Sequence, residues 1–330
     1  MPTNHNIEDL AGQIDRVRSE IGKVIVGHQE VVDGVLMAML AGGHVLLEGV
    51  PGLGKTTLLR TLGRALQLKY SRIQFTPDLM PADIVGSMVM ETLDGGLKNL
   101  RFQAGPIFAH LVLADEINRA TPKTQSAMLE AMQERTVTSG TTTHELEEPF
   151  LVMATQNPLE MEGTYPLPEA QLDRFLMKIL VRYPSRKELD IIVERTLAAT
   201  QPQIQRVVDR DEILEVRRAA REVLVAPHVR DFATSLVLAT QPEQAEAHPL
   251  AKKFIRYGSS PRGAQALVQS GRVLAVMRGR WNLSIDDLRY LALPCLRHRI
   301  IMNFDAHAEG KTPDQLITDI MAAIPVGALP

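Results

Sequence analysis

Cysteine is nearly absent from this chain. Its 330 residues include one cysteine, Cys295, which excludes a disulfide within the chain and a metal cluster held by several thiolates of one chain. Cys295 lies among Leu291, Leu293 and Leu296, so we expect a thiol packed in the core rather than a reactive nucleophile. The nine histidines show no paired ligand spacing such as H-x-x-x-H, and we expect no structural metal.

Long apolar runs are also missing. None approaches the roughly 20 residues that a helix needs to cross a bilayer. The longest candidate, residues 31–41, contains Asp33 and predicts a buried helix instead. The first six residues have neither the basic region nor the apolar region of an export signal. We therefore expect a cytoplasmic protein without membrane insertion.

The chain has little excess charge and few aromatic side chains. The formal net charge is −3, and aromatic residues make up 4% of the composition. Nucleic-acid binding usually needs a basic surface and, for single strands, aromatic side chains that stack on the bases. We therefore expect no nucleic-acid partner. The length of 330 residues predicts about two domains.

The most informative stretch is residues 49–56, which match the phosphate-binding pattern G-x-x-x-x-G-K-[ST] at every position. A short, mostly apolar run at residues 44–48 precedes it, and apolar residues at helical spacing follow it, so the context is strand, loop and helix. The residues expected to hold the nucleotide are Gly49, Val50, Pro51, Gly52, Leu53, Gly54, Lys55, Thr56 and Thr57.

The residue types in this loop follow from the chemistry of phosphate. Glycines let backbone N–H groups turn toward phosphate oxygens, and the following helix directs its positive end at the same anion. Lys55 is expected to hold the β- and γ-phosphates, and the Thr56 hydroxyl is expected to be a Mg²⁺ ligand. The loop therefore predicts ATP and Mg²⁺ as cofactors.

Polar side chains follow two further apolar runs that read as buried strands. Residues 111–114 lead to Asp115 and Glu116, and residues 150–155 lead to Asn157. Ligands of open parallel sheets bind beyond the carboxyl ends of the strands. Asp115 is expected to hold Mg²⁺, directly or through water, and Glu116 to activate the attacking water. Asn157 could contact the γ-phosphate or that water. The alternatives are that the carboxylates begin a solvated turn and that Asn-Pro is only a turn.

Strands alternate with helices up to residue 184, which predicts an α/β domain at residues 1–184 with a mostly parallel sheet covered on both faces. Two hairpins are expected, one at residues 84–102 around a turn at 94–96 and one at residues 136–148, and prolines at positions 77 and 81 predict a loop before the first. Residues 185–330 read as a helical second domain. Val26 and Gly27, between two predicted N-terminal helices, could lie against an adenine ring, although a plain turn explains them almost as well.

Six short phrases resemble signatures of the MoxR-type AAA+ ATPases. They are QFTPDL at residues 74–79, GPIF at 105–108, ADEINRA at 114–120, ATQNP at 154–158, EAQLDRF at 169–175 and SPR at 260–262. The resemblance covers nearly the whole chain. It implies a P-loop AAA+ core with a five-stranded sheet, two β-hairpin inserts and a C-terminal all-α lid domain.

The resemblance also implies roles for particular residues. Asp115 and Glu116 would be the Walker B pair, Asn157 the sensor 1 residue, Arg174 an arginine finger offered to a neighbouring subunit, and Arg262 the sensor 2 residue of the lid. A guanidinium suits both arginine roles because it can donate two parallel hydrogen bonds to a phosphate.

The sequence leaves alternatives for these arginines. Arg174 follows Asp173 and could form a local ion pair, and Arg262 follows Pro261 and could only cap a helix. Whether Arg262 would act on the nucleotide of its own subunit or of a neighbour stays open. Arg119, beside the acidic pair, could be a further contact between subunits.

The family that the chain resembles implies a function. We expect a Mg²⁺-dependent ATPase that forms a homo-oligomeric ring, a hexamer, and acts as a chaperone-like remodelling or maturation factor for protein complexes. Its client could be a protein with a von Willebrand factor A domain. The alternatives are a nucleic-acid motor or loader of the related AAA+ helicase type and a nucleotide-gated scaffold with negligible hydrolysis.

Overall fold

The computed structural model describes residues 6–50, 52–92, 98–157, 163–198 and 202–325. It begins with helices α1 (Ile7–Gly22) and α2 (Gln29–Ala41), which precede strand β1 (Val45–Glu48) and helix α3 (Lys55–Ala65). Four apolar residues of α1, at helical spacing, are buried; they are Leu10, Ile14, Val17 and Ile21. The two helices expected before the phosphate-binding loop are therefore confirmed.

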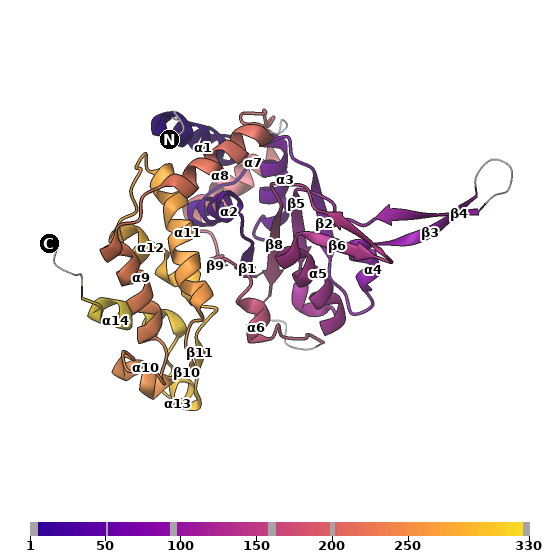
Figure 1. Cartoon of the computed structure of the whole chain (residues 1–330). Helices are drawn as coiled ribbons and strands as arrows, with labels where there is room; N and C mark the ends of the chain where they lie inside the picture. Colours follow the sequence, from indigo (N-terminus) through magenta and orange to yellow (C-terminus); the bar gives the residue numbers. More distant parts are fainter. Residues whose placement is uncertain (1–5, 51, 93–97, 158–162, 199–201, 326–330) are drawn as a thin grey trace.

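A parallel sheet lies at the centre of the molecule (Figure 1). In the described part of the chain it has five strands, in the order β2 (Tyr70–Gln74), β5 (Leu111–Asp115), β8 (Leu151–Gln156), β1 and β9 (Met177–Leu180). Each neighbouring pair is parallel. Side chains alternate between its faces, with Val45 and Leu47 in one apolar core and Leu46 in the other. The predicted sheet is confirmed, and all of its carboxyl ends lie at one edge.

Helices cover both faces of this sheet. The first core contains α1, α2 and α3, and the second contains α5 (Pro122–Glu134) together with the short elements α4 (Pro81–Val85) and η1 (Ile117–Arg119). The short helix α6 (Glu169–Leu172) precedes β9. Each strand run that the sequence marked as buried is therefore buried on two sides.

Both predicted hairpins are present, with one correction. Strand β3 (Gly86–Thr92) pairs with β4 (Lys98–Ala104), and β6 (Thr136–Ser139) pairs with β7 (Thr142–Glu145). Figure 1 shows the first hairpin projecting from the body; the turn expected at residues 94–96 lies outside the described residues. The loop expected around Pro81 is wrong, since α4 begins there. Proline suits the first helical position, where its missing N–H would have no helical partner.

The C-terminal region is mostly helical. Its helices are α7 (Arg186–Leu197), α8 (Arg210–Glu222), α9 (Pro227–Ala239), α10 (Pro249–Phe254), α11 (Pro261–Met277), α12 (Ile285–Leu296), α13 (Phe304–Ala308) and α14 (Pro313–Ala323). The expectation of an all-α region needs a correction, because β10 (Ile255–Tyr257) pairs antiparallel with β11 (Ile301–Met302). Strands this short leave no period-two pattern in a sequence.

The helical region and the α/β region share one apolar core. That core extends from Leu10 in α1 to Ile320 in α14, because α8 and α11 pack against α2 and α12 packs against β9. Cys295 is fully buried in it, and burial raises the pKa of its thiol to about 11, so the packed thiol is confirmed. A domain boundary after residue 184 stays a prediction. No helix of the described residues is both long and apolar enough to cross a bilayer.

Candidate active site

The phosphate-binding loop connects β1 to α3 at the carboxyl edge of the sheet. Gly52 and Gly54 have φ angles of 84° and 78°, a conformation that glycine adopts because it has no Cβ. Lys55 begins α3, and its Nζ donates to the carbonyl of Gly49 at 2.6 Å. Burial lowers the pKa of Lys55, and nearby carboxylates oppose this shift. The cation of the loop is thus folded back against the backbone beside two acidic side chains.

Thr155 fixes the acidic pair next to this loop. The carboxyl ends of β1, β8 and β5 lie side by side in the parallel register. The Thr155 hydroxyl donates to Asp115 Oδ1 at 2.7 Å and accepts from the backbone N–H of Glu116 at 2.8 Å. Glu116 has a φ of 56°, which is uncommon for a residue other than glycine and recurs at active sites. One hydroxyl therefore orients the first carboxylate and the backbone of the second.

Two side chains of β2 reach the same carboxylates. Arg72 donates to Asp115 Oδ2 from Nε at 3.1 Å and from Nη2 at 2.7 Å. The same Nη2 donates to Gln74 Oε1 at 2.5 Å, and Gln74 Nε2 donates to Glu116 Oε2 at 3.1 Å. Arg119 Nη1 forms an ion pair with that Glu116 oxygen at 3.0 Å. Each carboxylate therefore has a guanidinium partner within its own subunit.

These groups surround a pocket of about 380 Å³, which we call the P-loop pocket. Its described lining residues are Gly49, Gly52, Gly54, Lys55, Thr56, Thr57, Arg72, Gln74, Asp115, Glu116, Thr155, Gln156 and Asn157. The volume lies in the range of small-molecule sites. The structure thus brings together most of the residues that the sequence assigned to the nucleotide, the acidic pair and sensor 1.

The P-loop pocket also fits Mg²⁺. The Thr56 hydroxyl and the Asp115 carboxylate both line it, and oxygen atoms are the ligands that this ion prefers. Among the described residues, no cluster of three or more His, Cys, Asp or Glu side chains could hold a metal by itself. Mg²⁺ does not need such a cluster, because it is usually held by one or two carboxylates, water and substrate phosphates.

Other predicted nucleotide contacts lie outside the lining of this pocket. Leu53 packs against the apolar core, and Val50 is not among the described lining residues. Pro51 lies outside the described residues. Val26 and Gly27 lie between α1 and α2, where a Cβ on Gly27 would be 2.2 Å from a carboxylate oxygen of α7. Contact of these two residues with adenine therefore stays a prediction.

Arg174 lies at the opposite edge of the sheet. It precedes β9, which runs parallel to β1 with Met177 beside Val45, whereas the phosphate-binding loop follows β1. The length of β1, about 13 Å for its four residues, therefore separates the two edges. Arg174 Nη1 donates to the carbonyl of Leu129 in α5 at 2.9 Å. Its guanidinium is thus held away from the P-loop pocket of its own subunit.

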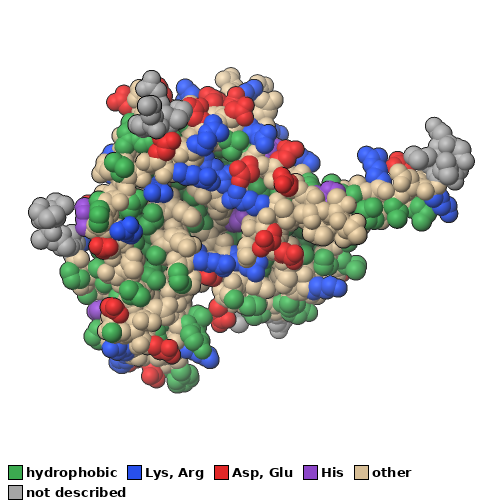
Figure 2. Space-filling model, in the orientation of Figure 1, with side chains coloured by type: hydrophobic (Ala, Val, Ile, Leu, Met, Phe, Trp, Pro, Cys, Tyr) green, Lys and Arg blue, Asp and Glu red, His purple; other side chains and the backbone are tan. Residues whose placement is uncertain are grey.

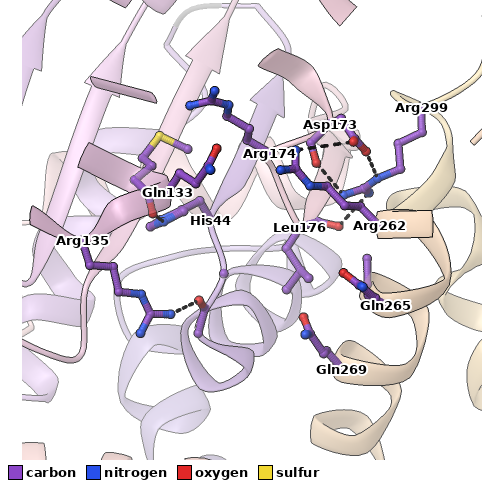
Figure 3. A pocket seen from close by; sticks show the side chains of 14 residues that line it. His44, Gln133, Arg135, Asp173, Arg174, Leu176, Arg262, Gln265, Gln269 and Arg299 are labelled. Atoms are coloured by element: carbon purple, nitrogen blue, oxygen red, sulfur yellow. Dashed lines mark hydrogen bonds and ion pairs between the residues drawn. The ribbon is translucent and has the colours of Figure 1, made fainter. Parts of the chain in front are cut away.

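Arg174 and Arg262 line a second pocket, of about 230 Å³, which we call the arginine pocket (Figure 3). Its described lining residues are Gly42, Gly43, His44, Met132, Gln133, Arg135, Asp173, Arg174, Leu176, Arg262, Gln265, Ala266, Gln269 and Arg299. Lys and Arg side chains gather along the hollow between the helical and α/β regions (Figure 2). The two described pockets share no lining residue.

The structure also decides between alternatives for the two arginines. The Asp173 carboxylate lies 2.8 Å from Arg299 and 3.6 Å from Arg262, while Arg174 is bonded to a carbonyl of α5, so the interpretation of an Asp173–Arg174 pair is wrong. At the start of α11 the cap is Ser260, whose Oγ accepts from the Arg262 backbone N–H at 3.1 Å. The Arg262 side chain is therefore not the helix cap.

Comparison with known proteins identifies the family. Residues 44–177 match the model of the "ATPase family associated with various cellular activities (AAA)", and residues 248–320 match that of the AAA lid domain. The chain is 41% identical over 321 residues to Chaperone MoxR1 of Mycobacterium tuberculosis, covering 96% of this chain and 84% of that protein. The chain belongs to the MoxR-type AAA+ ATPases.

Further relatives agree with this assignment. Protein MoxR of Paracoccus denitrificans is 30% identical, with 98% of this chain and 99% of that protein covered. The crystal structure of a protein assigned as an ATPase from Cytophaga hutchinsonii superposes with a TM-score of 0.91 at 38% identity, covering 98% of this chain and 97% of that one. This MoxR-type protein is therefore an ATP-hydrolysing enzyme.

Sequence reasoning missed several residues around the two pockets of this MoxR-type ATPase. Arg72 and Gln74 occupy alternate positions of β2, a spacing that places both on one face of the strand. That spacing was a usable signal once β2 and β5 were known to be neighbours. Thr155 carried no such signal, since threonine is a common residue in strands. Asp173 and Arg299 lie 126 residues apart, so no local pattern could pair them.

Proposed function

We propose that this MoxR-type ATPase hydrolyses ATP with Mg²⁺ at sites shared between neighbouring subunits of a ring, a hexamer. The observation that supports this is the separation of the two pockets. The acidic groups and the phosphate-binding loop lie at one edge of the sheet, and Arg174 lies at the other. A head-to-tail contact that closes into a ring would bring the arginine edge of one subunit to the loop edge of the next.

In the P-loop pocket, the residues of one subunit bind the nucleotide and handle the proton. Backbone N–H groups of the loop and Lys55 hold the phosphates, and Thr56 with Asp115 would hold Mg²⁺, which would neutralise phosphate charge. Glu116 orients the attacking water and accepts its proton at a carboxylate oxygen. Asn157 lines the same pocket and can hydrogen-bond either the terminal phosphate or that water.

The arginine pocket supplies the remaining positive charge. Arg174 and Arg262 line it together, and neither is among the described lining residues of the P-loop pocket. We therefore propose that both act on the nucleotide of the neighbouring subunit. Phosphoryl transfer places extra negative charge on the phosphate oxygens, and a guanidinium can donate two parallel hydrogen bonds to them.

The cellular role is proposed by analogy. One relative bears the name Chaperone MoxR1, which supports a chaperone-like role in remodelling or maturing protein complexes. A protein with a von Willebrand factor A domain as client and a cytoplasmic location are parts of the same proposal. The projecting β3–β4 hairpin exposes Met88, Met90 and Leu100, which gives a flexible apolar surface for a protein client.

A mixing experiment tests the shared site. Arg174→Ala leaves the P-loop pocket intact but removes the finger, and Glu116→Gln leaves the arginine pocket intact but removes the base. Each variant alone should be nearly inactive. In an equal mixture about a quarter of the contacts in a closed ring should pair an intact base with an intact finger, so turnover should return.

The result distinguishes a site shared between two subunits from a site that is complete within one subunit. Recovery of turnover on mixing supports sites shared between subunits. If the mixture is no more active than its parts, although both variants bind nucleotide and assemble, the shared site is wrong. A rate per subunit that does not change on dilution to the monomer would contradict it independently.

A further inference from the structure

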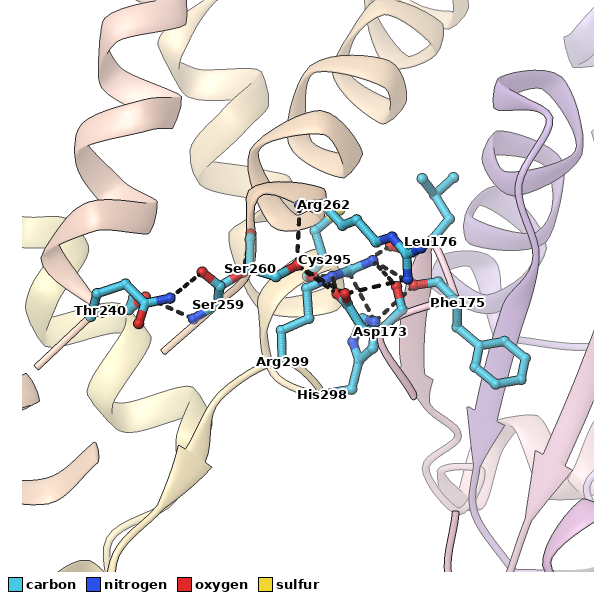
Figure 4. A network of polar contacts seen from close by, with 11 residues as sticks. Asp173, Phe175, Leu176, Thr240, Ser259, Ser260, Arg262, Cys295, His298 and Arg299 are labelled. Carbon is cyan, nitrogen blue, oxygen red and sulfur yellow. Dashed lines mark hydrogen bonds and ion pairs between the residues drawn. The ribbon is translucent and has the colours of Figure 1, made fainter. Parts of the chain in front are cut away.

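Asp173 lies where the arginine pocket meets the helical region (Figure 4). Arg299 Nε donates to its Oδ1 at 2.8 Å, and the Ser260 hydroxyl lies 3.0 Å from Oδ1 and 2.9 Å from Oδ2. Arg262 Nη1 lies 3.6 Å from Oδ2, an ion pair longer than a hydrogen bond. One carboxylate thus joins the segment before β9, the start of α11 and the turn after α12.

The two guanidinium partners of Asp173 are held to different degrees. The Arg299 side chain is 3% exposed, and it also donates to backbone carbonyls of residues 173, 175, 176 and 295. The Arg262 side chain is 46% exposed and meets Asp173 through the 3.6 Å contact. Arg299 is therefore a fixed part of the scaffold, and Arg262 is the partner that can leave.

The arginine pocket carries more positive than negative charge. Arg135, Arg174, Arg262 and Arg299 line it, and Asp173 is the one acidic side chain among its described lining residues. The space of about 230 Å³ is below the usual size of a complete ligand site but is sufficient for a phosphate group. An anion that enters the pocket would therefore meet Arg174 and Arg262 together.

We propose that Asp173 is a positioning residue that holds Arg262 beside Arg174 until a phosphate group of the neighbouring subunit's nucleotide takes Arg262 over. The inference rests on the proposed function, because it assumes that the arginine pocket faces a neighbour. Arg299 and Ser260 keep the carboxylate in place during this exchange. A guanidinium that is already near its target loses less conformational freedom when the phosphate arrives.

Asp173→Asn tests the proposal through turnover and binding. We expect kcat to fall about tenfold or more, because misplacing a catalytic group by about 1 Å can cost up to roughly 100-fold. The affinity of the P-loop pocket for a fluorescent ATP analogue, measured on the same protein, should not change. An unchanged kcat overturns the proposal, and so does a loss of turnover that is explained entirely by weaker nucleotide binding.

A double variant tests whether Asp173 acts through Arg262. If it does, Asp173→Asn should change kcat less than about twofold in a protein that already carries Arg262→Gln. A further tenfold loss in that background would show that Asp173 acts by another route, which contradicts the proposal.

The mixing experiment separates failure of this inference from failure of the shared site. Asp173→Asn has an intact P-loop pocket, so Glu116→Gln subunits should rescue it just as they rescue Arg174→Ala. If Arg174→Ala is rescued and Asp173→Asn is not, the positioning role is wrong while the shared site stands. If neither is rescued, both are wrong.

A second variant covers the case in which Asp173→Asn does not fold, since it leaves the buried Arg299 without its carboxylate. Ser260→Gly removes the hydroxyl that contacts Asp173, and glycine is an acceptable N-cap residue for α11. We expect about a threefold lower kcat with unchanged nucleotide affinity, in line with the loss of one part-buried hydrogen bond. Wild-type turnover in this variant would overturn the proposal.

Discussion

The P-loop pocket and the arginine pocket belong to the same sheet but differ in charge and in what holds them. At the carboxyl edge, glycines of the loop, Lys55 and two carboxylates line one pocket. At the opposite, amino edge of the sheet, four arginines and one carboxylate line the arginine pocket, and helix α11 of the C-terminal region supplies Arg262. The P-loop pocket has the groups that a nucleotide site needs, whereas the arginine pocket offers mainly positive side chains that could contact phosphate oxygens.

This difference underlies our proposal that one subunit is insufficient. In the proposed shared site, the charges that meet during hydrolysis lie at opposite edges of a parallel sheet, so they would meet only when a second copy docks. Within one subunit the acidic pair is instead paired with Arg72 and Arg119, and Arg262 is paired with Asp173. The charged groups at each edge therefore have partners within one subunit, and we propose that they react at a contact between subunits.

The largest expected effect concerns the amino edge. Arg174→Ala should lower kcat by about 10³-fold or more, the effect of removing an arginine finger in related phosphoryl transfer. Nucleotide affinity of the same subunit should stay within about twofold, because Arg174 does not line its P-loop pocket. Steady-state turnover and equilibrium binding measure the two quantities. Arg218→Ala, an exposed arginine of α8, is the matched control and should be neutral.

The next prediction concerns the carboxyl edge. Glu116→Gln should lower kcat by about 10²-fold to 10⁴-fold, because an amide cannot accept the proton of the attacking water. ATP should still bind, since Lys55 and the loop are unchanged. Glu243→Gln, an exposed carboxylate of the helical region, should behave as wild type. Normal turnover in purified Glu116→Gln would contradict the assignment of Glu116 as the general base.

The buried His44, which lines the arginine pocket at the amino edge of the sheet, should make the stability of the fold depend on pH. Its Nδ1 accepts from the backbone N–H of Val152, and its Nε2 contacts the carbonyl of Met132, both at 3.0 Å, which suits a neutral ring. Burial lowers the pKa of His44 to about 4 from 6.5. The imidazole of His44 therefore binds a proton more readily in the unfolded chain than in the folded one. The stability that the neutral ring contributes is fully present above pH 6.5 and is lost as the pH falls toward 4.

The size of this effect can be measured with a variant that does not titrate. The shift corresponds to about 3 kcal/mol of unfolding free energy at most. Urea denaturation of His44→Gln between pH 7 and 4 should show a correspondingly shallower loss of stability than wild type. His307→Gln, at an exposed site, should keep the wild-type slope. Equal slopes for His44→Gln and wild type would contradict a buried neutral imidazole.

The smallest expected effect is on the Mg²⁺ concentration that nucleotide binding at the P-loop pocket requires. Arg72 neutralises the carboxylate that would hold Mg²⁺, and its side chain is 47% exposed. Arg72→Gln should therefore lower the Mg²⁺ concentration needed for half-maximal nucleotide binding by about twofold to fivefold, the range of an exposed ion pair. Binding titrations at fixed nucleotide measure this shift. A higher Mg²⁺ requirement would mean that Arg72 orients Asp115 for the ion instead.

Much of the P-loop pocket was predictable because its signals are local. The loop pattern, the apolar runs before Asp115 and Asn157, and the helical spacing after Lys55 each lie within a few residues. The local signal at Pro81 was misread, since proline suits the first position of a helix, and no local signal marks β10 and β11, which are too short to be recognised.

The sequence by itself predicted which residues would handle phosphate, because a loop, a strand end and a helix start are set by neighbouring residues along the chain. It also marked Arg174 and Arg262 through family phrases. Only the tertiary structure decided that the strands lie in the order β2-β5-β8-β1-β9, which sends Arg174 to the edge opposite the loop. It alone decided that Asp173 pairs with Arg299 and Arg262 rather than with its neighbour in sequence. Strand order and long-range ion pairs depend on how buried surfaces pack, and no short stretch of residues encodes that.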